Sequence, residues 1–212
     1  MSSAYASSLV LNHIRKIDPK IIVECGACDG SDTLELMEVY KPNIIHTFEC
    51  NPENIPLCHK KLDGHPNIVF VPKAVSDVTG SIQFYPGDMM GCRIANSGIS
   101  SAYPFNDGYP QFKLKEPVII PSTRLDDYMS ESSLKTIDLL CMDTQGSELD
   151  GLKGLGNRID DVKAVVCEVW FTPYYKGIPV LDDIDGYMRQ HGFKRTELYK
   201  YDDFGDALYL RK

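Results

Sequence analysis

Apolar and amphipathic segments alternate along the first third of the chain. Residues 5–17 place apolar side chains on one face at helical spacing, and Pro19 ends that segment. An uninterrupted apolar run follows and ends at Gly26, which favours a strand buried on both faces of a parallel sheet. The same alternation predicts helices over residues 32–40 and 53–62 and strands over residues 44–49 and 68–72.

The alternation stops between residues 80 and 122, where glycine, proline and aromatic residues are frequent. Residues 81–85 and 118–120 can pair as an inserted hairpin, which leaves residues 87–116 as a long mobile loop. A loop of this length inside a compact domain is usually either functional or disordered.

Regular alternation returns after residue 122. It predicts strands over residues 137–142 and 162–169, helices near 147–153 and 180–191, and closing strands over residues 193–198 and 207–211. A short polar turn joins the closing strands, so they should be antiparallel. Residues 1–212 are therefore predicted to form one α/β domain, a doubly wound Rossmann-like sheet of about seven strands with the last strand antiparallel.

Composition and net charge argue against several classes of function. The 212 residues include 22 basic and 30 acidic side chains, a net charge of −8, which argues against nucleic-acid binding and against charge-driven binding to anionic lipid. No apolar run approaches the roughly 18–20 residues of a membrane helix, and we expect no signal peptide. The seven cysteines are an odd number and are scattered, which favours reduced thiols and a cytoplasmic location.

Carboxylates follow the predicted strands. Ligands of open α/β sheets bind beyond the carboxyl ends of the strands. Glu24, Glu49, Asp143 and Glu168 stand at four of these ends, and Asp77 follows the strand over residues 68–72. The sequence therefore predicts an acidic site at this edge of the sheet.

The first strand end indicates the cofactor. It lacks the G-x-G-x-x-G of dinucleotide sites, and the acidic Glu24 before the loop would repel phosphate but suits an ammonium or sulfonium group. Glu49 is placed like the acid that binds both ribose hydroxyls. Together these features predict that the cofactor is S-adenosylmethionine. The alternative is that Gly26 and Gly30 are simple turn residues that bind no cofactor. The predicted cofactor contacts are Glu24, Gly26, Ala27, Asp29, Gly30, Thr33, Glu49, Cys50, Asn51, Ala74, Val75 and Ser76.

Five segments resemble one known family. They are residues 23–33 (VECGACDGSDT), 48–52 (FECNP), 73–77 (KAVSD), 123–127 (TRLDD) and 137–148, which contains Asp143-Thr-Gln-Gly-Ser-Glu148. In this order they resemble the FkbM family of methyltransferases. The resemblance implies a class I methyltransferase fold, S-adenosyl-L-methionine as donor and methylation of hydroxyl groups. It also implies acceptors such as sugars, including a deoxysugar like rhamnose on a glycan, and a place beside or fused to glycosyltransferases.

The chain departs from the family pattern at three positions. Glu24 and Cys28 stand where the family usually has Asp and Asn, and Gln145 replaces the middle acid of D-x-E-G-x-E. Gln145 removes a carboxylate, so we predict no metal, although Asp126, Asp127, Asp143 and Glu168 could supply oxygen ligands for Mg²⁺.

Methyl transfer to an alcohol needs a general base, because a hydroxyl barely ionises at neutral pH. Asp143 is the predicted base or substrate anchor, and Glu168 the neighbouring acid; helix capping is the alternative role for Asp143. Aromatic residues 170–175 suit a sugar ring, although Trp170 can equally belong to the core. Residues 97–103 either close over the cofactor or form a disordered flap. The predicted substrate contacts are Ser101, Tyr103, Gln145, Trp170, Tyr174 and Tyr175.

Three other readings remain open. Cys25 and Cys28 have the C-x-x-C spacing of redox sites, but they lie in the predicted cofactor turn. An NAD-dependent nucleotide-sugar oxidoreductase or epimerase would need the missing glycine motif. A non-catalytic module that kept the methyltransferase fold is the third alternative, and loss of cofactor binding would support it.

Overall fold

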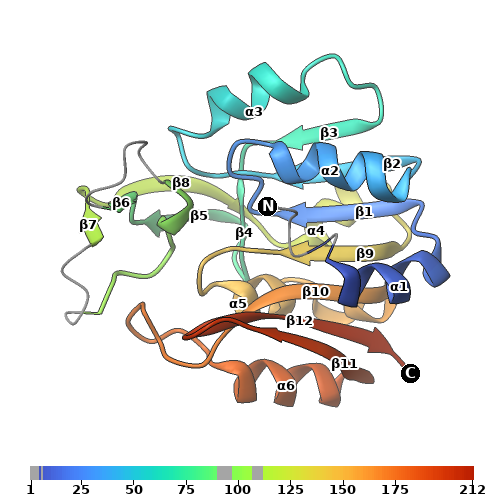
Figure 1. The fold of residues 1–212 in the computed structure, drawn as a ribbon. Helices are drawn as coiled ribbons and strands as arrows, with labels where there is room; N and C mark the ends of the chain where they lie inside the picture. The colour runs from blue at the N-terminus through green and yellow to red at the C-terminus, as the bar shows by residue number, and fades with distance from the viewer. Residues whose placement is uncertain (1–4, 6, 90–96, 107–111) are drawn as a thin grey trace.

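The computed structural model describes residues 5, 7–89, 97–106 and 112–212, and Figure 1 gives their arrangement. A seven-stranded sheet has the order β11-β12-β10-β9-β1-β2-β3, in which β12 alone runs antiparallel to its neighbours. This confirms the predicted doubly wound sheet. The strands are β1 (Ile21–Cys25), β2 (Ile44–Phe48), β3 (Ile68–Val71), β9 (Ile137–Met142), β10 (Val162–Trp170), β11 (Phe193–Lys200) and β12 (Phe204–Arg211).

Helices cover both faces of this sheet (Figure 1). One apolar cluster joins α1 and α2 to one face, and a second joins α4, α5 and α6 to the other, while α3 packs beside β3. All six residues of β9 are buried, and five of them are apolar. The exception, Asp138, accepts the backbone amides of Lys20 and Ile21 and pairs with Lys163. The helices are α1 (Ser8–Ile17), α2 (Ser31–Tyr40), α3 (Ile55–Leu62), α4 (Leu125–Glu131), α5 (Glu148–Lys153) and α6 (Leu181–Gln190). A 3-10 helix spans Gly156–Asp161.

A small lobe lies beside the carboxyl ends of the parallel strands (Figure 1). In it β8 (Val118–Thr123) pairs with β5 (Gly80–Phe84) in antiparallel fashion and with β4 (Ala74–Val75) in parallel. The predicted hairpin is therefore confirmed, with Ile82 opposite Ile120.

The expectation of one long loop over residues 87–116 is wrong for the part that the structure describes. β6 (Gly87–Met89) pairs with β7 (Phe112–Leu114), and a 3-10 helix spans Ser97–Ile99. Residues 90–96 and 107–111 of that predicted loop lie outside the described residues.

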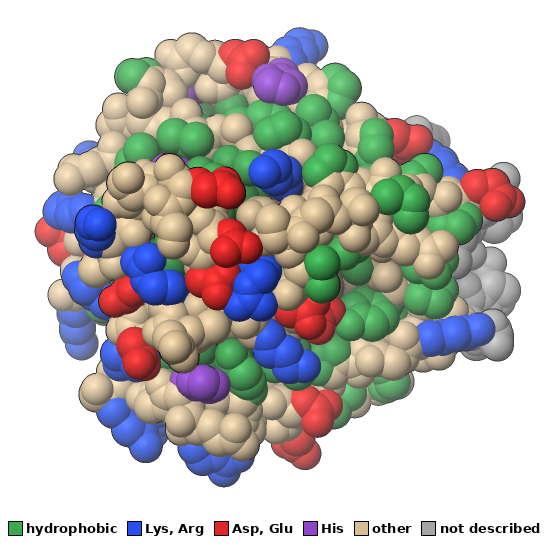
Figure 2. Space-filling view, turned by 180° about the vertical axis from the view of Figure 1, so that it is seen from behind, with side chains coloured by type: hydrophobic (Ala, Val, Ile, Leu, Met, Phe, Trp, Pro, Cys, Tyr) green, Lys and Arg blue, Asp and Glu red, His purple; other side chains and the backbone are tan. Residues whose placement is uncertain are grey.

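The molecular surface carries mixed charges. On the face seen in Figure 2, acidic and basic side chains are interspersed rather than gathered by sign. Among the helices of the described residues, none is long and apolar enough to cross a membrane.

Candidate functional site

A cavity of about 190 Å³ opens between the carboxyl ends of β1, β2 and β9 and the small lobe. It lies where the sequence predicted the ligand. Of the predicted residues, the wall includes Gly26, Glu49, Cys50, Asn51, Ala74, Val75, Asp143 and Gln145. The predicted segment 97–103 also contributes Gly98, Ser100 and Ala102 to the wall. Wall residues that were not predicted as contacts include Phe48, Asn54, Lys73, Ile82, Phe84, Thr144 and Ser147.

Glu49 is fixed at the end of β2 by backbone donors. The amides of Cys28, Cys50 and Asn51 donate to its carboxylate at 2.6, 2.8 and 2.7 Å. Burial raises the pKa of Glu49, and these bonds oppose that rise. The side chain is 6% exposed and lines the cavity, so it is preorganised to accept hydroxyl donors such as those of a ribose.

The turn after β1 depends on Gly26. Its φ is +95°, and a Cβ at this position would lie 1.9 Å from the carbonyl oxygen of Asp143. Only glycine lets the turn approach the end of β9 so closely. Gly26 and Asp143 both line the cavity where these two strand ends meet, and the contact of Gly26 with a cofactor stays a prediction.

Several predicted cofactor contacts support this turn from outside the cavity wall. Asp29 forms an ion pair with Lys61 at 2.6 Å, and the side chain of Ala27 packs against α3 residues. Gly30 is the N-terminal cap of α2. The side chain of Ser76 bonds to Asp77. Contact of these four residues with a cofactor stays a prediction, and none of them is part of the cavity wall.

Glu24 lies beneath the cavity instead of in its wall. Thr33 and Thr47 donate to its Oε2 at 2.5 and 2.6 Å, while Oε1 is buried and has no partner among the described residues. Burial raises the pKa of Glu24 to about 7. An unpaired buried acceptor fits an ammonium group, and S-adenosylmethionine carries one together with its reactive sulfonium methyl.

A glutamine bridges the two predicted catalytic acids. Nε2 of Gln145 donates to Asp143 Oδ1 at 2.6 Å and to Glu168 Oε2 at 3.0 Å. On the other side of the amide, the Tyr175 hydroxyl lies 2.9 Å from Gln145 Oε1. The amide therefore holds both carboxylates in place, with Asp143 on the cavity wall and Glu168 6% exposed behind it.

Glu148 shapes the loop that carries these residues. Its carboxylate accepts bonds from the amides of Thr144 at 2.9 Å and Gly146 at 3.0 Å. Burial raises the pKa of Glu148 to about 7. Glu148, the last acid of the D-x-Q-G-x-E segment, thus anchors the loop that precedes α5. The alternative helix-capping role of Asp143 is not observed, because the carboxylate that accepts the backbone amides of this loop belongs to Glu148.

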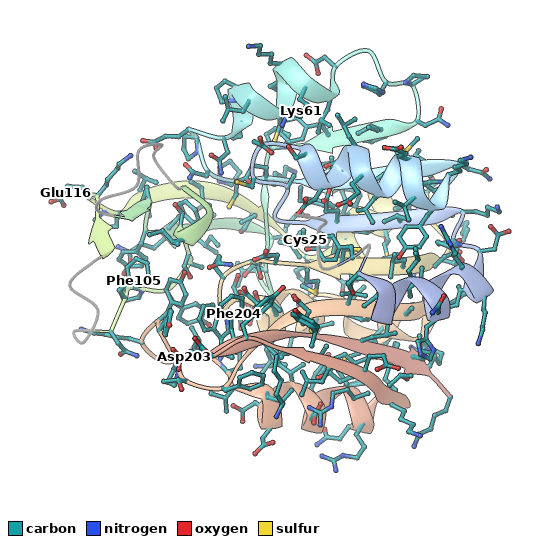
Figure 3. All side chains as sticks on the ribbon, in the orientation of Figure 1. Cys25, Lys61, Phe105, Glu116, Asp203 and Phe204 are labelled. Atoms are coloured by element: carbon teal, nitrogen blue, oxygen red, sulfur yellow. The ribbon has the colours of Figure 1, made fainter. Side chains whose placement is uncertain are left out.

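The predicted substrate residues have two kinds of surroundings: Ser101 and Tyr103 hold the small lobe in place, and the aromatic residues pack in a cluster. Ser101 Oγ donates to the carbonyl of Gln145 at 2.6 Å, and the Tyr103 hydroxyl donates to Asp150 at 2.6 Å, so both tie the small lobe to the main sheet. Gly98, Ser100 and Ala102 of the same segment face the cavity. Figure 3 places Phe105 of the lobe across from Asp203 and Phe204, and Phe105 stacks on Tyr175 with a centroid distance of 4.7 Å.

Trp170 is 3% exposed and belongs to an aromatic cluster with Tyr174, Tyr175 and Phe204. Its burial fits the core role that the sequence left open. The Tyr174 hydroxyl donates to Asp203 at 2.7 Å, which orients that ring at the edge of the cluster.

The two cysteines of the C-x-x-C segment do not have reactive surroundings. Burial raises the pKa of Cys25, and burial followed by the charge of Glu49 raises that of Cys28 to about 11. Both thiols are protonated at neutral pH, which disfavours redox chemistry. Cys28 has a φ of +53°, a left-handed conformation that an Asn tolerates better than a Cys. Among the described residues, no group of three His, Cys, Asp or Glu side chains is arranged to hold a metal ion.

The chain is similar to several known methyltransferases. The chain is 27% identical over 180 residues to the 2-O-methyltransferase NoeI of Sinorhizobium fredii, covering 83% of this chain and 73% of that protein. It is also 27% identical to Methyltransferase 1 of Beauveria bassiana, over 71% of this chain and 66% of that protein. An rRNA methylase from Streptococcus thermophilus has the same fold, with a TM-score of 0.53 at 11% identity over 95% of this chain and 93% of that one.

The family comparison decides the class. Residues 24–195, which contain the cavity wall and the glutamine-bridged acids, match the family described as the methyltransferase FkbM domain. The chain belongs to this family and is an S-adenosylmethionine-dependent methyltransferase.

Proposed function

We propose that this methyltransferase methylates a hydroxyl group of a sugar, such as a deoxysugar like rhamnose, on a glycan or glycoconjugate. The observation that carries the proposal is the pair of carboxylates, Asp143 and Glu168, held by Gln145 at the edge of the cavity. Carboxylates side by side accept hydrogen bonds from neighbouring hydroxyls, which is the pattern that a sugar presents. The similarity to an enzyme named as a 2-O-methyltransferase supports an oxygen acceptor.

The carboxylates take different parts in this reaction. Asp143 accepts the proton of the acceptor hydroxyl while that oxygen forms its bond to the methyl carbon and the carbon–sulfur bond breaks, which leaves S-adenosylhomocysteine. Glu168 binds an adjacent hydroxyl and orients the ring. Gln145 keeps the two carboxylates apart and correctly directed, so the site needs no cation between them.

The test uses the purified chain and isotope-labelled S-adenosylmethionine with a panel of acceptors. The panel contains rhamnose-terminated oligosaccharides, other neutral oligosaccharides, a catechol and a primary amine. We expect label in the sugars and a methyl ether in the product by NMR. Transfer to the catechol or the amine without transfer to any sugar would refute the proposal. The NAD-dependent alternative is tested in parallel by titration with NAD, for which we expect no binding.

Glycosyltransferases are the proposed neighbours of this activity, because an enzyme that modifies a glycan acts on the product of sugar transfer. Co-purification of the chain with a glycosyltransferase from its native source would support this part. A cytoplasmic location is likewise a proposal, tested by fractionation of cells that express the full-length protein.

A further inference from the structure

We infer that the hairpin β11–β12 forms a second acceptor subsite, which binds the sugar unit next to the one that is methylated. This inference rests on the proposed sugar acceptor and goes beyond it, because it makes the substrate an oligosaccharide instead of a free monosaccharide. Its residues are Asp206, Tyr199, Tyr201 and Phe204, none of which the sequence singled out.

The strand register lines up a row of polar side chains from the cavity to the hairpin. Glu168 is opposite Asp206, and Asp206 is opposite Tyr199. The last residue pair of β9 and β10 is Met142 with Cys167, so Asp143 and Glu168 are next in line. Directly opposed residues point to the same face of a sheet, so Asp143, Glu168, Asp206 and Tyr199 share one face.

A row of aromatic side chains runs beside the polar row. Trp170 is opposite Phe204, and the Tyr201 amide donates to the carbonyl of Phe204. These residues are two positions along each strand from the polar row and therefore lie on the same face. Tyr201 stacks on Phe204 with a centroid distance of 4.7 Å, and Phe204 lies 5.5 Å from Trp170. Figure 3 places Phe204 and Asp203 at the hairpin end that lies on the carboxyl-end side of the sheet.

This face is the one that α1 covers farther along the sheet. Val166 and Leu208, one step along the same strands, pack in the cluster that contains α1 residues. At the hairpin the side chains on this face are exposed to solvent instead: Tyr199 and Tyr201 are each 45% exposed. Large aromatic side chains exposed next to an active site commonly mark a binding surface.

The aromatic row also holds a buried polar group that needs a partner. Nε1 of Trp170 is buried and has no hydrogen-bond partner in the part of the chain that the structure describes. A buried donor without an acceptor is costly, and a ligand hydroxyl would satisfy it.

The chemistry of the two rows selects a neutral, hydroxyl-rich ligand. Asp206 hydrogen-bonds Tyr201, and burial together with the charge of Asp143 raises the pKa of Asp206 to about 7. A carboxyl group that is half protonated near neutral pH both donates to and accepts from hydroxyls. The rows contain no Lys or Arg, so they do not favour a phosphate-bearing ligand.

Size indicates more than one sugar unit. From Asp143 to Tyr199 the polar row crosses three strand spacings, roughly 14 Å at about 4.8 Å each. A single pyranose ring at the methyl-transfer position covers only the Asp143 and Glu168 end. The aromatic faces of Tyr201 and Phe204 then suit the C–H face of the adjoining sugar.

The experiment compares a rhamnose-terminated trisaccharide with methyl α-rhamnoside. Tyr199→Ala and Tyr201→Ala, singly and together, should raise the KM for the trisaccharide by up to about tenfold and leave kcat/KM for the monosaccharide unchanged. Lys200→Ala, whose side chain lies over Phe171 on the other face of the same hairpin, is the control and should change neither. An equal effect of the hairpin variants on both acceptors, or none on the trisaccharide, overturns the inference.

A binding measurement separates this inference from the proposed reaction. Trp170 is the only tryptophan of the chain, so its fluorescence reports ligand binding in the aromatic row without catalysis. The trisaccharide should change this fluorescence in the presence of S-adenosylhomocysteine, and the hairpin variants should abolish the change. If this holds while no sugar is methylated, the proposed reaction fails and the subsite stands. If sugars are methylated but the trisaccharide leaves the fluorescence of wild type unchanged, the subsite fails alone.

Discussion

Replacing Glu24 by Gln should remove a pH-dependent loss of stability. The side chain is fully buried, and burial raises its pKa from 4.5 to about 7. A carboxyl group with a raised folded-state pKa costs the folded state nothing while both states are protonated, below pH 4.5. The cost grows as the pH rises from 4.5 to 7 and is constant above that. At 1.36 kcal/mol for each pH unit, the raised pKa of Glu24 lowers the free energy of unfolding by about 1 kcal/mol at pH 5, where only the unfolded state ionises, and by about 3 kcal/mol at pH 8, where both states ionise.

Glu24→Gln keeps the acceptor of the two threonine bonds and cannot ionise. Its amide hydrogens add a buried donor whose cost, about 1–3 kcal/mol, does not depend on pH. The informative quantity is therefore the difference between pH values. Between pH 5 and pH 8, the free energy of unfolding of wild type should fall by about 2 kcal/mol more than that of the variant.

Urea unfolding of the cofactor-free chain at pH 5, 6, 7 and 8 measures this difference. Glu148 and Asp206, whose pKa values are also raised and whose charges are not among the causes that shift Glu24, are present in both proteins and cancel in the comparison. Glu38→Gln, on the exposed side of α2, is the matched control and should follow wild type at every pH. Parallel curves for wild type and Glu24→Gln would refute the argument that this buried carboxyl titrates near pH 7.

Three further outcomes are expected. Gly26→Ala should abolish S-adenosylmethionine binding in calorimetry, because its Cβ would lie 1.9 Å from the Asp143 carbonyl oxygen, whereas Gly64→Ala, with a φ of +92° and open space around it, should retain binding. Cys28→Asn should raise the Tm by about 2–4 °C in calorimetry, because Asn accepts the left-handed backbone at a lower cost. Asp143→Asn should lower kcat by about 10²-fold or more without weakening cofactor binding, and retained turnover would move the role of base to Glu168.

The strands of the main sheet were predictable because burial dictates their composition. β9 is buried at every residue, and five of its six residues are apolar. α4 was not predicted, since its seven residues complete two turns and give too short a pattern for helical periodicity. The β6–β7 pair was missed for a similar reason, because two strands of three residues carry no clear alternation.

The site was predictable where a residue follows a parallel strand. Glu49, Asp143 and Gln145 reach the cavity because the carboxyl ends of β2 and β9 meet at one edge. Asp206 escaped this reasoning because it lies near the amino end of β12, which the antiparallel direction of that strand brings to the same edge. The ion pair of Asp29 with Lys61 was not predictable, because strand position does not reveal a partner from α3.

Several acidic side chains lie close together at the carboxyl-end edge of the sheet, and each disfavours ionisation of its neighbours. After burial, the charges of Asp143, Glu148 and Asp206 raise the pKa of Glu168 further, and Asp143 acts in the same way on Glu148 and Asp206. Natural proteins often retain such a loss of stability at residues that their function requires. S-adenosylmethionine brings a sulfonium and an ammonium charge to this edge, and a cation favours the ionised form of every nearby carboxyl. By linkage, ionisation of the carboxyls strengthens cofactor binding to the same extent that binding lowers their pKa values. The cofactor's positive charge thus opposes the repulsion among the acids and favours ionised Asp143, which is the state in which it can accept a proton.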